Sequence, residues 1–167
     1  MDVYKKFKNF LDKLLLYTAL TMLAAMTIVI IHQVFSRQIL DHTPSWSEEL
    51  SRVLFVWVAF LGIAYGFKEK LHIGVGLVVK MLPEKLQTFF EYLAKVLIIG
   101  FGLLMIYYGW HFTTLMGNST LPGLGLPSSI LYVVIPITGF YTLLYGIELL
   151  FVKGLYDDYG DDVGSEG

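Results

Sequence analysis

Four long apolar stretches dominate the 167-residue sequence and restrict it to one class of fold. Residues 14–36 carry no formal charge, and as a helix they would extend about 34 Å, enough to cross a hydrocarbon core of about 30 Å. Residues 96–116 and 129–147 are similar runs, whereas residues 53–67 are short unless their helix begins earlier. Only 16% of the residues are charged, compared with about 25% in soluble domains. The sequence therefore predicts an all-α integral membrane protein of one domain with four transmembrane helices.

Basic residues are distributed unequally between the two sides of these spans, which predicts the orientation of the chain. Short loops on the cytoplasmic side of a membrane protein are enriched in lysine and arginine. Ten lysines fall on the side that holds the termini, whereas Arg37 and Arg52 fall on the other side. Both termini are therefore predicted to be cytoplasmic. The ten lysines are Lys5, Lys6, Lys8, Lys13, Lys68, Lys70, Lys80, Lys85, Lys95 and Lys153.

Two segments outside the spans are predicted to form short amphipathic helices on the membrane surface. Residues 3–14 place apolar side chains at helical spacing with lysines between them, a pattern suited to anionic membrane lipids. Residues 71–82 are too short to span, and their polar positions His72, Gly76 and Lys80 fall four apart. We expect this segment to be an interfacial helix with a narrow polar stripe.

The membrane domain is predicted to cover residues 1–153, and the acidic residues 154–167 are expected to be a disordered tail. Pro136 lies within the fourth span, where its ring should free the Tyr132 carbonyl and bend the helix. Residues 117–127 form an uncharged loop rich in turn residues. The predicted spans are residues 14–36, 46–67, 94–116 and 129–152.

The second span begins with three charged residues. Ser45 starts an S-x-x-E capping box that ends at Glu48, and Glu48 lies four residues before Arg52 in the order that favours a helical ion pair. Glu49 could compete for the same arginine. A helix that begins near Trp46 gives this span sufficient length. Two interpretations remain: the charges cap the helix and reach water at the membrane edge, or they meet polar groups of a partner subunit.

Glycines in the spans predict where helices pack closely. Gly62 and Gly66 form a GxxxG pattern, which allows a neighbouring helix to approach the backbone of the second span. The third and fourth spans offer further small surfaces, at Gly100, Gly102, Gly109, Gly139 and Gly146.

The sequence lacks the residue patterns of catalysis and cofactor binding. It contains no cysteine, which excludes disulfides, thiolate metal sites and cysteine nucleophiles. Its serines cluster at predicted helix starts, where capping explains them, and it has neither a glycine-rich phosphate loop nor a basic patch for nucleic acid. We predict a protein that is not an enzyme, with no catalytic residue, metal ion, cofactor or nucleic-acid partner.

Two alternative functions for a four-span protein stay open. A multidrug or ion exchanger would need a carboxylate near the membrane centre, but Glu48 and Glu49 fall at the outer end of span two and Glu148 falls near the inner end of span four. A haem protein with two histidine ligands would use His32 and His111, near the outer ends of spans one and three. The sequence shows no central polar cluster of the kind that binds solute at the midplane, so a helper or scaffold subunit is favoured.

Several motifs then point to one family. The segment "PSWSEELSRVLFVWVAFLG" (residues 44–62), followed by "HIGV" (72–75), "LP" (82–83) and "LPSSILYVVIP" (126–136), resembles the small, DctQ-like membrane subunit of tripartite ATP-independent periplasmic (TRAP) transporters. The resemblance covers the chain from the first span to the fourth. The Trp-Ser-Glu-Glu-Leu stretch with its arginine is the most specific part. One departure is Gly76, where the family often has an acidic residue.

The resemblance implies a non-catalytic scaffold subunit of a sodium-coupled importer of organic acids, such as dicarboxylates or sialic acids, in a bacterial inner membrane. A periplasmic substrate-binding protein would capture the solute. A large membrane subunit of roughly twelve spans would hold the substrate and sodium sites, and this chain would pack against it. Gly62 and Gly66 would serve close helix packing. The residues expected at the partner interface are Trp46, Glu48, Glu49, Arg52 and Trp57.

Overall fold

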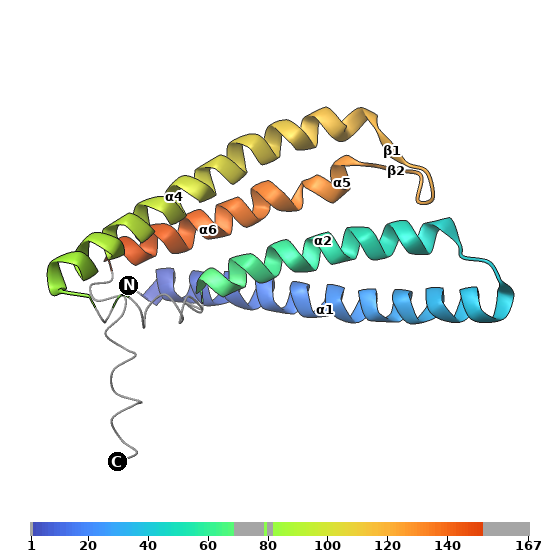
Figure 1. Ribbon diagram of the computed structural model, residues 1–167, viewed down its shortest axis with the longest axis horizontal. Helices are drawn as coiled ribbons and strands as arrows, with labels where there is room; N and C mark the ends of the chain where they lie inside the picture. The colour runs from blue at the N-terminus through green and yellow to red at the C-terminus, as the bar shows by residue number, and fades with distance from the viewer. Residues whose placement is uncertain (1, 69–78, 80–81, 152–167) are drawn as a thin grey trace, which may run out of the picture.

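The computed structural model describes residues 2–68, 79 and 82–151, and it confirms the predicted all-α membrane protein with four spans (Figure 1). The predicted interfacial helix, with His72 and Lys80, lies almost entirely outside the described residues, as does the acidic tail. The long helices are α1 (Asp2–Leu40), α2 (Ser45–Lys68), α4 (Glu84–Leu115) and α6 (Val134–Phe151). The short elements between α4 and α6 are a 3-10 turn η1 (Met116–Asn118), the strands β1 (Thr120–Leu121) and β2 (Leu126–Pro127), and α5 (Ser129–Tyr132).

The helices form two antiparallel pairs, α1 with α2 and α4 with α6, and the pairs meet through α2 and α6 (Figure 1). One end of the bundle holds the start of α1, the start of α4 and the end of α6; we call it the lysine end, because Lys6, Lys8, Lys13 and Lys85 lie there. The other end holds the α1–α2 connection and the β1–β2 hairpin, and we call it the hairpin end. The axes of the two pairs converge at the lysine end and diverge toward the hairpin end (Figure 1).

Helix α1 differs from the expectation of a separate surface helix. It is continuous over 39 residues, about 58 Å, so the N-terminal amphipathic segment continues the helix of the first span and is not a separate helix. The physical reason is a partner within the chain: Leu15 is buried in a core with Tyr141 and Tyr145 of α6, and Leu11 packs against that core. The apolar side of the segment is therefore partly covered by protein.

The buried core is small and lies at the lysine end, where α1, α2 and α6 converge. Its central side chains are Leu15, Ala64, Tyr141 and Tyr145. Large apolar side chains on α1 and α4 are mostly exposed, as expected for surfaces that face lipid. Since lipid provides no hydrophobic driving force between helices, the helix pairs must be held by close backbone packing and by polar contacts.

Close packing between α4 and α6 depends on glycines that the sequence predicted only as small surfaces. A Cβ atom added at Gly139 would lie 2.8 Å from Met105 Cβ and 2.9 Å from the Ile106 amide nitrogen, and one added at Gly102 would lie 3.0 Å from the Leu143 nitrogen. A side chain at any of these positions would push the two backbones apart. Gly62 behaves differently, because no heavy atom of the described chain lies within 4 Å of its would-be Cβ.

The fourth span is interrupted near Pro136, as the sequence predicted. Helix α5 ends at Tyr132 and α6 begins at Val134, and the Val133 amide donates to the Ser129 carbonyl across the break. Proline at position 136 has no N–H to return to the Tyr132 carbonyl, which weakens the helix at this point. The proline ring instead packs on α4, because a Cβ at Gly109 would lie 2.8 Å from Pro136 Cδ.

Candidate functional site

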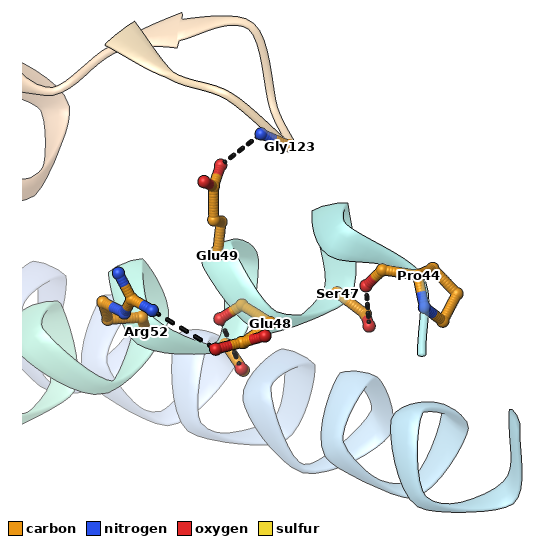
Figure 2. Close-up of polar contacts among 7 residues, drawn as sticks. Pro44, Ser47, Glu48, Glu49, Arg52 and Gly123 are labelled. Carbon is orange, nitrogen blue, oxygen red and sulfur yellow. Dashed lines mark hydrogen bonds and ion pairs between the residues drawn. The ribbon is translucent and has the colours of Figure 1, made fainter. Parts of the chain in front are cut away.

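The charged start of α2 is organised by contacts that differ from the predicted capping box. The helix begins at Ser45, one residue earlier than expected, so this serine already belongs to the helix. The Pro44 carbonyl accepts hydrogen bonds from both the amide (3.1 Å) and the hydroxyl (2.7 Å) of Ser47 (Figure 2). Ser47 is fully buried, which fixes the first turn of α2 against its surroundings.

Glu49 binds the β1–β2 hairpin. Its Oε2 atom accepts hydrogen bonds from the backbone amides of Gly123 (2.8 Å) and Leu124 (3.0 Å). Figure 2 shows the Glu49 side chain pointing from α2 to the tip of the hairpin. Two amide donors on one carboxylate oxygen supply this acid with hydrogen bonds without a basic side chain. Glu49 therefore joins the two helix pairs at the hairpin end, instead of competing for Arg52.

The hairpin tip is shaped to deliver those two amides. The Leu121 carbonyl accepts from the amides of Leu124 (3.2 Å) and Gly125 (2.8 Å), which closes the turn. Gly125 has φ of +66°, a left-handed conformation that glycine adopts without strain. Gly123 meets a second requirement: a Cβ there would lie 2.7 Å from the backbone carbonyl carbon and oxygen of Ser45. Only glycine lets the tip sit this close to the start of α2.

Glu48 and Arg52 form the helical ion pair that the sequence predicted. Arg52 Nη2 lies 3.4 Å from Glu48 Oε1, and the two side chains are 56% and 62% exposed (Figure 2). An exposed pair of this kind stabilises a helix by only about 0.3–0.5 kcal/mol. Both side chains are more than half exposed, so their polar groups remain available to another molecule.

The two tryptophans of the predicted interface have different surroundings. Trp57 Nε1 donates a hydrogen bond to the Ile130 carbonyl of α5 (2.9 Å), which makes Trp57 a second tie between the helix pairs. Trp46 is 41% exposed, and its ring centroid lies 5.4 Å from that of His32 on α1. Trp46 thus belongs to the exposed part of the site, whereas Trp57 is directed into the chain.

The exposed charges continue into an exposed face that runs along α2. Glu48, Arg52, Phe55, Ala59 and Gly62 recur at alternating spacings of four and three residues and are all exposed, so they lie on one side of the helix. We call these five residues the α2 face. It carries charges at the hairpin end and small side chains further along, at Ala59 and Gly62. Gly66, the second glycine of the predicted pattern, is partly buried.

Other acidic and histidine residues do not assemble at this site. Glu148 pairs with Lys8 at the lysine end, and His111 is exposed on α4, whereas His32 is next to Trp46. Over the described ranges of the chain, no three histidine, aspartate or glutamate side chains are placed together to hold a metal ion. The chemistry that the arrangement offers is recognition of another molecule through charge and shape.

The contact that sequence reasoning missed is the one between Glu49 and the hairpin tip. The sequence contained two signals. Glu49 lies near Arg52, which already has Glu48 as a possible partner, and the uncharged Pro-Gly-Leu-Gly turn at residues 122–125 offers backbone amides. Nothing in the sequence placed them together, because 74 residues separate Glu49 from Gly123.

Comparison with known proteins identifies the family. A family model described as "Tripartite ATP-independent periplasmic transporters, DctQ component" matches residues 26–153. The chain therefore belongs to the DctQ component family of TRAP transporters, whose members are transport components and not enzymes. This is the small permease subunit of a TRAP transporter, a multi-pass protein of the inner membrane, and membership favours the transporter subunit over the exchanger and haem alternatives.

Individual relatives agree with that assignment. The chain is 31% identical over 131 residues to a putative TRAP transporter small permease protein of Haemophilus influenzae, covering 78% of this chain and 81% of the relative. It is 30% identical over 114 residues to the C4-dicarboxylate TRAP transporter small permease protein DctQ of Pseudomonas aeruginosa, 65% of this chain and 50% of the relative. It is also 30% identical over 101 residues to the sialic acid TRAP transporter permease protein SiaT of H. influenzae, 60% of this chain but 16% of that protein.

Proposed function

We propose that this chain is a non-catalytic scaffold that packs against, and stabilises, the large transport subunit of a sodium-coupled, binding-protein-dependent importer of organic acids. The observation that carries the proposal is the α2 face, an exposed helix surface that no other described part of the chain covers. Its small residues allow a second helix to approach closely, and its charges offer a specific polar contact at the membrane edge.

The kind of partner follows from the relatives. The similar segment of the H. influenzae sialic acid permease is 16% of that protein, so there it is part of a much longer permease chain. A surface that faces such a chain must be exposed in the small subunit alone. The α2 face meets that requirement, and Trp46 lies beside its charged end. Glu49 and Trp57 would contribute indirectly, by fixing α2 relative to the second helix pair.

The solute class is inferred from the names of the relatives. Two of them are named for sialic acid and for C4-dicarboxylates, and both solutes carry carboxylates. We infer an organic acid as the transported solute, delivered by a periplasmic binding protein. The orientation is inferred from charge: with the lysine end in the cytoplasm, both termini are cytoplasmic and the α2 charges face the periplasm.

The decisive experiment separates a helical ion pair from an interface. Arg52→Glu should abolish solute uptake in liposomes that contain the complete transporter. The double variant Glu48→Arg with Arg52→Glu restores an ion pair within the helix but reverses the charges presented to a partner. If a partner reads these charges, the double variant stays inactive and copurifies poorly with the large subunit. Wild-type uptake by the double variant would show that the pair acts only within α2, and the interface role would be wrong.

A second experiment tests whether the chain acts as a scaffold or as a transporter by itself. Calorimetry on the purified small subunit should detect no binding of C4-dicarboxylates or sialic acids, because the described chain offers no polar solute site at mid-membrane depth. Micromolar binding to the subunit alone would contradict the scaffold role and support an autonomous transporter.

A further inference from the structure

The lysine end contains a polar joint between α1 and α6 that the proposed transport role does not use. Lys8 Nζ contacts both carboxylate oxygens of Glu148, and the hydroxyl of Tyr145 donates to Asp12 Oδ1 at 2.7 Å. The partners are 140 and 133 residues apart in the sequence. These contacts fasten the first turns of α1 to the last turns of α6, two helices whose backbones are not extensively packed on each other.

The polar bonds of the joint surround a space that side chains do not fill. A cavity of about 60 Å³ lies among the four polar side chains, with Leu11, Tyr141 and Leu144 completing its walls. That volume is sufficient for water, which can compete for the same hydrogen bonds. The ion pair itself is partly open, since the Lys8 and Glu148 side chains are 30% and 35% exposed. A joint of this construction can open without separating the glycine-packed helices α4 and α6.

The segment that the joint holds has a second favourable environment. Residues 3–14 combine apolar residues at helical spacing with Lys5, Lys6, Lys8 and Lys13, the pattern of a helix that lies on an anionic membrane surface. The same Lys8 that pairs with Glu148 would there face lipid phosphate. The docked and surface arrangements therefore compete for one lysine. Exchanging them requires α1 to bend before Leu15, whose side chain is anchored in the core.

We propose that Lys8, Asp12, Tyr145 and Glu148 form a latch that docks the N-terminal turns of α1 on α6, and that phosphate groups of anionic lipids open it by competing with Glu148 for Lys8. In the closed state the segment extends the first span. In the open state it lies on the membrane, and Asp12 and Glu148 are hydrated at the membrane surface. The lipid composition at the lysine end then sets the position of this segment.

The chain has no cysteine, so spin labels can be attached at introduced cysteines without removing native ones. Asn9→Cys on α1 and Leu150→Cys on α6 are both at exposed positions and report the distance across the latch. In phosphatidylcholine nanodiscs, pulsed electron paramagnetic resonance on the full chain should give one short distance. In phosphatidylglycerol nanodiscs a second, longer distance should appear. Glu148→Gln and Tyr145→Phe should each produce the longer distance already in phosphatidylcholine.

The charge-swapped double variant Lys8→Glu with Glu148→Lys is the matched control. It restores the ion pair but removes the positive charge from position 8, so it should stay closed in both lipids. Inorganic phosphate added at equal ionic strength to phosphatidylcholine nanodiscs distinguishes free phosphate from lipid. Opening by inorganic phosphate to the same extent would overturn the assignment to lipid. A single short distance in every variant and both lipids would overturn the latch itself.

Discussion

The two ends of the bundle bind their partly or fully buried acids in different ways. At the hairpin end, Glu49 is held by two backbone amides of a turn, donors that almost any residue supplies. At the lysine end, Asp12 and Glu148 are held by the side chains of Tyr145 and Lys8, donors that only particular residues supply. The difference shows which substitutions should break each contact. The contact of Glu49 depends on the backbone shape of the turn, whereas the contacts of Asp12 and Glu148 depend on the side chains of both partners.

The largest effect is expected from a change in the shape of the hairpin tip. Gly123→Val should prevent the tip from reaching α2, because even a Cβ would lie 2.7 Å from the Ser45 backbone. The variant then loses both amide contacts to Glu49, and we expect a loss of about 3 kcal/mol in the free energy of unfolding. Denaturant titration in detergent micelles measures it. Gly117→Val is the control, because that position has open space; an equal loss in both variants would contradict the fit of the tip.

The next largest loss of stability is expected at Glu49, and the neighbouring acid Glu48 provides the comparison. Glu49→Ala leaves the Gly123 amide without its acceptor and the Leu124 amide with only its longer bond to the Leu121 carbonyl. We expect it to lower the free energy of unfolding by about 2 kcal/mol. Glu48→Ala breaks only an exposed ion pair and should cost about 0.5 kcal/mol. Hydrogen exchange of the Gly123 amide should accelerate in the first variant alone. Equal exchange rates in the two variants would show that Glu49 does not hold the hairpin.

A smaller effect is expected from the polar joint at the other end. Tyr145→Phe removes the donor to Asp12 with little change of shape and should cost about 1 kcal/mol. Because the contact needs both side chains, the loss in the double variant of Tyr145→Phe with Asp12→Asn should be smaller than the sum of the two single losses. Additive losses would mean that the two residues do not act as a pair, and the contrast with the backbone-held Glu49 would then disappear.

A substitution at Gly62 should have the smallest effect on the stability of the chain. It should have a large effect on assembly with the large subunit. Gly62→Trp should leave the unfolding of the isolated subunit within about 0.5 kcal/mol, because the position faces open space. If the α2 face receives a helix of the large subunit, the same change should block their copurification. Gly100→Trp on α4 also faces open space and serves as the control. Normal assembly of the Gly62 variant would place the partner elsewhere.

Much of the fold could be predicted from the sequence because membrane insertion depends on local properties. A run of uncharged residues such as 14–36 is a spanning helix in almost any tertiary context, since its backbone must satisfy its own hydrogen bonds in lipid. The same locality explains the Glu48–Arg52 pair, which lies within one turn of one helix. The interruption near Pro136 is also local, because it follows from a missing backbone N–H.

The candidate site could be predicted only in part. Sequence placed five residues at one interface, whereas the structure directs Glu49 and Trp57 into the chain and leaves Glu48, Arg52 and Trp46 exposed. A residue's type and position along a helix do not reveal which side of that helix another segment covers. For the same reason Gly62 and Gly139 look alike in sequence, yet only Gly139 lies against another backbone.

By itself, the sequence determined that this protein has four membrane spans and which family motifs they carry. It also placed the start of the second span within one residue of the observed start at Ser45. Tertiary structure alone decided that the N-terminal segment continues the helix of the first span and that a hairpin turn binds Glu49. It also decided that Asp12 and Glu148, near opposite ends of the chain, bind Tyr145 and Lys8. The physical reason is the distance along the chain over which each effect acts. Hydrophobicity, ion pairs within a helix and proline act over a few residues, whereas the hydrogen bonds of Glu49 and Asp12 come from donors more than seventy residues away.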